Sequence, residues 1–261
     1  MPRANRYFLP GYVWHITHRC HKKEFLLKFA RDRRRWLHWL YEAKRRYGLC
    51  VLNYVVTSNH IHLLVKDSGT GVIPQSLQLI AGRTAQEYNN RKDRNGAYWE
   101  DRYHATAIET DAHLFRCLVY IDLNMVRAGV VSHPVEWPAG GYREIQSPPQ
   151  RYRIIDLSEL TRLCGEDNFS VFQQGYRQWV EEELKHNRLE RDAAWSNSIA
   201  VGSSAFVDKI RTALGSKAKS RTVTEEPERS VLREPIATYT ADFHPEMDSL
   251  RGENRLKWDD L

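Results

Sequence analysis

Residues 57–65, TSNHIHLLV, place two histidines on either side of a single apolar residue within an apolar run. Side chains of a β-strand alternate between its two faces, so His60 and His62 share one face while Ile61 and Leu63 point into the core. Two imidazoles on one face can bind a metal ion through two nitrogen ligands. A pair of half-exposed strand histidines without a ligand is the alternative, and this stretch alone does not decide between them.

Residues 111–129, DAHLFRCLVYIDLNMVRAG, predict one amphipathic helix. Asp111 is a suitable N-cap, and Gly129 is a suitable C-terminal stop. Apolar residues at helical spacing predict a buried stripe of Leu114, Leu118, Ile121 and Met125. The opposite face carries His113, Arg116, Tyr120, Asn124 and Arg127.

Tyr120 and Asn124 lie four residues apart on this polar face, so they are neighbours on the helix surface. A phenol beside a third candidate metal ligand, between Arg116 and Arg127, is suited to phosphodiester chemistry. The metal would polarise the phosphate, the arginines would offset its charge, and the phenolate would attack. Taken alone, Tyr120 could equally be a partly buried helix tyrosine.

The His-x-His strand and the later Tyr-x-x-x-Asn helix resemble the HUH single-tyrosine transposases, and most closely the REP-associated tyrosine transposases, which are related to transposases of the smallest bacterial insertion sequences. The resemblance covers about residues 1–147. Residues 3–18 resemble the family's basic start and first strand, WEDRYH at 99–104 the segment before its last core strand, and NMVRAG at 124–129 its helix end. Proline is commoner in the family at the position of Met125. Because methionine is the better helix former, we expect the helix to continue.

The resemblance implies cleavage and rejoining of single-stranded DNA at repeated extragenic palindromes folded as hairpins. Tyr120 would attack the phosphorus, form a 5′-phosphotyrosine bond and release a 3′-hydroxyl, so the protein would be an endonuclease and strand transferase. His60, His62 and Asn124 would hold Mg²⁺ or Mn²⁺. Ligand softness alone would have favoured zinc for the two imidazoles.

Positive charge is concentrated in the first part of the chain. Residues 1–150 hold 22 Lys and Arg against 13 Asp and Glu, whereas residues 151–261 hold 17 against 20. This asymmetry favours a polyanion ligand on the first part, although solvated charged faces are common. Tyr7, Phe8 and Trp14 could stack on bases or belong to the core. The candidate DNA-binding residues are Arg3, Arg6, Arg31, Arg34, Arg35, Arg116 and Arg127.

The predicted elements follow the order β-α-β-β-α-β-α. Strands are expected at 12–17, 49–56, 60–66 and 104–109, and helices at 27–47, 74–90 and 111–129. In the first helix Phe29, Trp36, Leu40 and Tyr47 should point inward. This order predicts an α+β fold with a ferredoxin-like, RRM-like antiparallel sheet covered by helices, which the resemblance also implies as the HUH fold. RNA-binding RRM domains share the order, but their aromatic strand motifs are missing here.

The composition changes after Pro148 and Pro149. We expect residues 1–147 to form the transposase domain. Residues 148–215 should form a small helical extension with helices at 157–163, 169–187 and 204–214. Residues 216–261 are polar and are expected to be flexible.

Cys20, Cys50, Cys117 and Cys164 are far apart, which indicates neither a zinc knuckle nor a disulfide framework. No apolar run approaches the length of a membrane span, and no signal peptide is recognisable, so we expect a bacterial cytoplasmic protein associated with the nucleoid. The choice between a monomer and a homodimer stays open. Two other functions also stay open: a structural or regulatory protein that binds palindromes without cutting them, and an RNA-processing nuclease.

Overall fold

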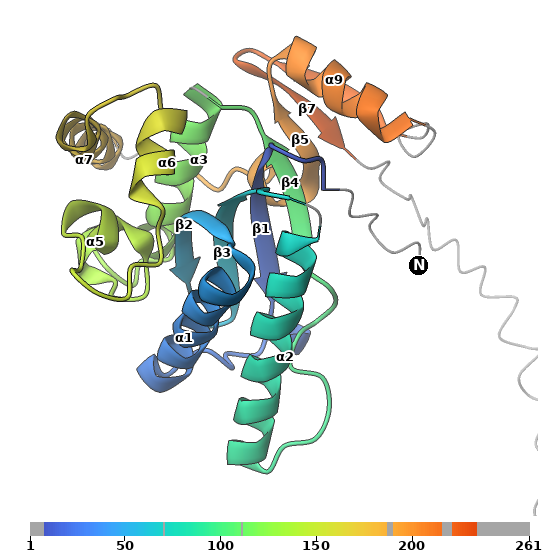
Figure 1. The fold of residues 1–261 in the computed structure, drawn as a ribbon, viewed down its shortest axis with the longest axis vertical. Helices are drawn as coiled ribbons and strands as arrows, with labels where there is room; N and C mark the ends of the chain where they lie inside the picture. The colour runs from blue at the N-terminus through green and yellow to red at the C-terminus, as the bar shows by residue number, and fades with distance from the viewer. Residues whose placement is uncertain (1–7, 70, 111, 187–189, 216–220, 234–261) are drawn as a thin grey trace, which may run out of the picture.

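The computed structural model describes residues 8–69, 71–110, 112–186, 190–215 and 221–233. Their strands form a seven-stranded sheet in the order β2-β3-β1-β4-β5-β7-β6 (Figure 1). The first four of these positions are antiparallel, and β1 lies between β3 and β4. The elements of this part are β1 (Val13–Arg19), α1 (Ala30–Tyr47), β2 (Cys50–Val56), β3 (His60–Lys66), α2 (Val72–Lys92), β4 (His104–Ile108) and α3 (Ala112–Asp122).

The β-α-β-β-α-β-α order and the α+β fold class are therefore confirmed. Helices α1 and α2 pack against each other and cover one face of the sheet (Figure 1). Helix α3 lies against the other face, because the ring of Tyr120 is 5.8 Å from the ring of His62. Both faces of the central strands are consequently covered, and Ile61, Leu63 and Leu64 are all buried.

The start of α1 differs from the prediction. The helix begins at Ala30 rather than near residue 27, and Phe29 is the residue that precedes it. Phe29 is 58% exposed, so its predicted inward position is wrong. Trp36 and Leu40 are buried as expected. Phe29 has extended backbone angles, which take its side chain off the helical stripe that those two residues follow.

The single helix predicted over 111–129 is interrupted. Helix α3 ends at Asp122, and α4 (Asn124–Arg127) follows after Leu123. A continuous helix would pair the carbonyl of Tyr120 with the amide of Asn124. Nη2 of Arg127 instead donates to that carbonyl oxygen at 2.5 Å. Methionine at position 125 thus does not keep the helix continuous. Gly129, at φ +65°, follows the end of α4 as the predicted C-terminal stop. The predicted N-cap, Asp111, lies outside the described residues.

The part after residue 147 contains strands as well as helices, so the prediction of a helical extension is incomplete. β5 (Ser198–Gly202) pairs in parallel with β4, β7 (Arg229–Arg233) pairs with β5, and β6 (Thr222–Glu226) pairs with β7. The hairpin of β6 and β7 contradicts the flexible tail over 222–233. Residues 216–220 and 234–261 lie outside the described residues.

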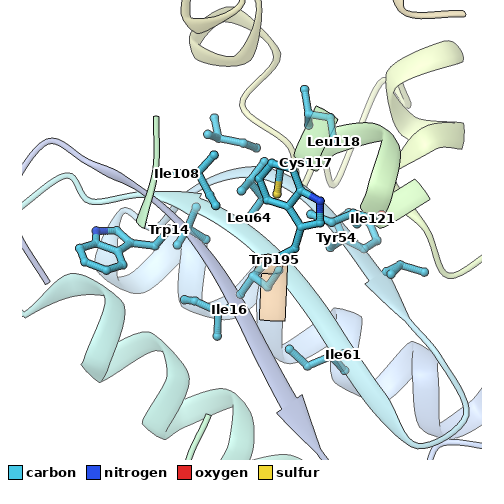
Figure 2. Packing of buried hydrophobic residues seen from close by; sticks show 14 of the residues in the cluster. Trp14, Ile16, Tyr54, Ile61, Leu64, Ile108, Cys117, Leu118, Ile121 and Trp195 are labelled. Carbon is cyan, nitrogen blue, oxygen red and sulfur yellow. The ribbon is translucent and has the colours of Figure 1, made fainter. Parts of the chain in front are cut away.

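Helix α5 (Gly141–Gln146) comes just before this part, whose α-helices are α6 (Leu157–Leu163), α7 (Phe169–Lys185), α8 (Ala194–Asn197) and α9 (Ser204–Leu214). Helices α6 and α9 have the predicted bounds, and α7 starts as predicted but ends at Lys185, before the predicted end at residue 187. Trp179 of α7 stacks on Phe115 of α3 with ring centroids 4.6 Å apart. Trp195 of α8 belongs to the same buried core as Trp14, Leu64 and Cys117 (Figure 2). The division of the chain at residue 147 stays a prediction.

A buried carboxyl group connects α3, β2 and α7. Oδ1 of Asp122 accepts a hydrogen bond from Nδ2 of Asn53 at 3.0 Å, and Oδ2 accepts one from the hydroxyl of Tyr176 at 2.5 Å. Burial raises the pKa of Asp122 to about 7 despite these bonds. The carboxyl therefore binds its proton more tightly in the folded protein than in the unfolded chain.

We expect Asp122→Asn to change how stability depends on pH. Because the pKa of Asp122 is raised on folding, this group makes the free energy of unfolding fall as pH rises from about 4 to about 7. An asparagine cannot ionise, so the variant lacks this fall. Its free energy of unfolding relative to that of wild type should therefore be higher at pH 8 than at pH 4 by a few kcal/mol. Urea unfolding at both pH values measures this, with the exposed Asp208→Asn as control. The same wild-type-to-variant difference at both values would contradict the expectation.

Candidate functional site

His62 lies in the middle of the sheet, on the face covered by α3. It is 3% exposed, so the reading of two half-exposed strand histidines fails for this residue. His60, the first residue of β3, is partly buried, and the two ring centroids are 5.0 Å apart. Nδ1 of His60 lies 2.7 Å from Oδ1 of Asn59, which can only accept a hydrogen bond, so Nδ1 carries the proton. Nε2 is then the ring nitrogen left for a ligand.

Both imidazoles are held in the neutral form. Burial, and after it the positive charges of Arg19, Arg191 and Arg127, together lower the pKa of His60 to about 4. Burial also brings the pKa of His62 well below its usual value, with His60 as the next largest cause. A metal ion binds the neutral ring, so near pH 7 neither histidine has to lose a proton first.

Asn124 faces His62 from the start of α4. Its Nδ2 lies 3.1 Å from Nε2 of His62. The oxygen and nitrogen of an amide exchange places when the group flips, so Oδ1 can occupy this position. Two ligand atoms at about 2.1 Å from one octahedral Mg²⁺ are about 3 Å apart. The spacing therefore fits two ligands of one metal ion.

The candidate metal ligands are two imidazoles and one amide. Within the described ranges, no group of three or more His, Cys, Asp or Glu side chains is placed to hold a metal. A metal at His60 and His62 would thus take its third protein ligand from Asn124. All three donors are neutral, so the ion would keep its full charge for an anionic ligand.

Tyr120 stands beside the histidines. Its ring is 5.8 Å from that of His62, and the guanidinium of Arg127 lies 4.2 Å from the centre of the phenol ring. The residue is 7% exposed, so it is a largely buried helix tyrosine that still lines an open pocket. Interruption of the helix at Leu123 lets Arg127 fold back over Tyr120 and hold its backbone carbonyl.

A pocket of about 820 Å³ joins these groups. Its walls come from four parts of the chain: the strands, helices α3 and α4 with the residue after them, the segment before β4, and α8 with the segment that leads into it. The charged and polar lining residues include Arg19, Glu100, Asp101, Arg102, Arg127, Arg191, Ser196 and Asn197. Four arginines and two acidic residues make the lining suitable for an anionic, hydrogen-bonding ligand.

The candidate DNA-binding arginines are spread over the molecule. Arg127 lines the pocket, whereas Arg116 pairs with Glu228 at 2.9 Å in an adjoining pocket of about 580 Å³ that Tyr120 also lines. Arg35 pairs with Glu87 at 2.6 Å. Arg31, Arg34 and Arg35 belong to α1, across the sheet from the histidines. Arg3 and Arg6 lie outside the described residues.

Two of the three aromatic candidates for base stacking pack in or against the core. Trp14 is 3% exposed, which confirms the core alternative, and Phe8 packs against it with ring centroids 5.0 Å apart. Tyr7 lies outside the described residues. The four cysteines are free thiols. Among the described helices, none is long and apolar enough to span a bilayer.

Sequence reasoning missed His15, Arg191 and Trp195. His15 is fully buried, and its Nε2 lies 2.9 Å from Nδ1 of His62. Its alternation with Thr17 in the first strand was a usable signal, because Thr17 pairs with His62 across β1 and β3. Arg191 and Trp195 reach the site only because β5 docks on β4, and no local pattern predicts that pairing.

Comparison with known proteins finds a family match for the first part of the chain. The model of the IS200-like transposase family matches residues 10–124. A REP-associated tyrosine transposase bound to a REP hairpin is 19% identical over 60% of this chain and 96% of its own, with a TM-score of 0.48. A proposed transposase from Deinococcus radiodurans R1 is 16% identical over 40% and 83% of the two chains, with a TM-score of 0.31. No curated protein matches. The matched residues 10–124 include both histidines, Tyr120 and Asn124, so this part of the chain is similar to the IS200-like transposase family.

Proposed function

We propose that this protein cleaves and rejoins single-stranded DNA beside palindromic hairpins of the REP type, through a 5′-phosphotyrosine on Tyr120. One observation carries the proposal: Tyr120 stands next to His62 in a pocket that His60, Asn124 and Arg127 also line. The family supplies the reaction class. The motif resemblance to REP-associated tyrosine transposases supplies the hairpin substrate.

His60, His62 and Asn124 would hold Mg²⁺ or Mn²⁺, which when bound supplies a divalent charge that polarises the scissile phosphate. Oη of Tyr120 gives up its proton to solvent and attacks the phosphorus, the bond from phosphorus to O3′ breaks, and the 3′-oxygen takes up a proton from solvent and leaves as a hydroxyl. Arg127 lies over the phenol ring and places a fixed positive charge beside the anionic groups of the reaction.

The phosphotyrosine bond retains the energy of the phosphodiester bond that it replaces. A second 3′-hydroxyl can therefore attack it, restore a DNA phosphodiester and release Tyr120 without ATP. Rejoining needs the same positioned groups as cleavage, because one step is the reverse of the other. A nuclease that uses water as its nucleophile would not conserve the bond.

The arginines are assigned different tasks in this proposal. Arg19, Arg127 and Arg191 line the pocket and would contact phosphates near the cut. Arg31 and Arg34 are exposed on α1 and would contact other parts of the hairpin. A protein that only binds palindromes needs such arginines, but it has no use for two neutral imidazoles, one of them buried, beside a tyrosine.

Incubation of the protein with end-labelled hairpin DNA and Mn²⁺, followed by a denaturing gel, tests the function. The expected product is a protein–DNA adduct through the 5′-phosphate created at the cut, together with the upstream fragment that ends in a free 3′-hydroxyl. An RNA hairpin of the same sequence is the matched comparison. Preference for the RNA would favour the RNA-processing alternative.

We expect cleavage to require a single-stranded target. The reacting phosphate must bend into a pocket between α3 and the sheet, which a flexible single strand does readily and a stiff duplex resists. A hairpin with a single-stranded flank should be cut at least about tenfold faster than the same sequence with that flank fully paired. Equal rates, measured side by side in Mg²⁺, would contradict the proposal and favour a double-strand nuclease.

A further inference from the structure

A continuous line of polar contacts runs through the core behind the candidate site. The carbonyl oxygen of Trp195 lies 2.6 Å from Nδ1 of His15, Nε2 of His15 lies 2.9 Å from Nδ1 of His62, and Nε2 of His62 lies 3.1 Å from Nδ2 of Asn124. The two imidazole rings are stacked with centroids 5.0 Å apart. His15 has no exposed surface, so water does not compete for its two contacts, with Trp195 and His62.

The Trp195 carbonyl and the burial of His15 determine which ring nitrogen of each histidine carries the proton. A carbonyl oxygen only accepts, so Nδ1 of His15 must donate to Trp195. Burial favours the neutral ring of His15, whose Nε2 then carries no proton and accepts from Nδ1 of His62. His62 consequently has a bare Nε2, which points toward Asn124. This is the tautomer that a metal ligand needs.

We propose that His15 is a positioning residue that sets the ring orientation and tautomer of His62, and that the extension takes part by holding His15 through the Trp195 carbonyl. The inference rests on the proposed role of His62 as a metal ligand. Neither His15 nor Trp195 touches the metal or the DNA in this arrangement; both act through His62.

Contacts with β4 hold the extension in place close to Trp195, whose carbonyl holds His15. The carbonyl of Ser198 accepts a hydrogen bond from the hydroxyl of Thr106 at 2.6 Å, and β5 pairs with β4 from Ala200 onward. These contacts fix the chain three residues after Trp195. The ring of Trp195 is buried, with its centroid 6.3 Å from that of Tyr120, so its carbonyl has little freedom to move away from His15.

The first test replaces His15 with leucine and measures Mn²⁺ binding to the full chain by calorimetry without DNA. Loss of the acceptor for Nδ1 of His62 should weaken Mn²⁺ binding about 10–100-fold. Thr161→Val is the control. It removes the hydrogen bond that a buried threonine of α6 donates to the carbonyl of Leu157, outside the pocket and away from His15 and Trp195, so Mn²⁺ affinity should stay within about twofold. Unchanged affinity in His15→Leu would overturn the inference.

The second test reads the tautomer directly and does not depend on a metal or on the variant folding. In ¹⁵N-labelled wild-type protein, the imidazole nitrogen shifts should show both His15 and His62 protonated at Nδ1 and bare at Nε2. A proton on Nε2 of either ring would overturn the inference. If wild type binds no Mn²⁺, the metal-ligand role of His62 fails, and the nitrogen shifts still decide whether His15 sets its tautomer.

Discussion

Tyr120→Phe should abolish strand cleavage and adduct formation, with a rate loss of about 10³-fold or more, because the nucleophile itself is removed. Binding to the hairpin should stay within about threefold of wild type. The variant loses one hydroxyl, while the phenyl ring keeps its place between His62 and Arg127. Denaturing gels measure cleavage, and a gel shift in EDTA measures binding.

Tyr88→Phe is the matched control for this experiment. Tyr88 belongs to α2, which covers the other face of the sheet, and it packs against Tyr98 with ring centroids 5.1 Å apart. It loses the same hydroxyl far from the pocket, so cleavage should remain at the wild-type rate. Cleavage by Tyr120→Phe at that rate would remove Tyr120 from the mechanism.

The core of the fold was predictable because its signals are local. Alternation of apolar residues around His60 and His62 defines β3, and the stripe of Leu114, Leu118 and Ile121 defines α3. Topology then brings Tyr120 to the face of the sheet that carries His62. The two motifs that suggested a site from the sequence are thus brought together by elements that the sequence predicts.

The features that sequence reasoning missed depend on contacts between distant parts of the chain. The break at Leu123 accompanies the bond from Arg127 to the Tyr120 carbonyl, whereas helix propensity at Met125 favours continuation. β5 becomes a strand beside β4 and β7, and the polar β6 forms a strand only through β7. The contact of His15 with His62 requires β1 to lie next to β3. Apart from the alternation of His15 with Thr17 in β1, these pairings leave no periodic signal at the residues themselves.

The metal gives the second large expected effect. EDTA should stop cleavage by the wild-type protein, and Mn²⁺ should restore it. His60→Ala and His62→Ala should each lower cleavage by at least about 100-fold in saturating Mg²⁺, because each removes one of three protein ligands. His38→Ala, an exposed histidine on α1, controls for the loss of an imidazole and should cleave normally.

Measurements of Mn²⁺ binding and hairpin binding distinguish the loss of a metal ligand from a disturbed fold. His62 is buried, so His62→Ala also leaves a cavity, and loss of cleavage alone would not distinguish a missing ligand from a disturbed core. The missing-ligand explanation predicts that His60→Ala, at the partly buried start of β3, loses Mn²⁺ binding and cleavage while it keeps hairpin affinity and wild-type thermal stability. Wild-type cleavage in EDTA, or by His60→Ala, would exclude a metal at these histidines, and the reaction would then have to rely on Tyr120 and the arginines that line the pocket.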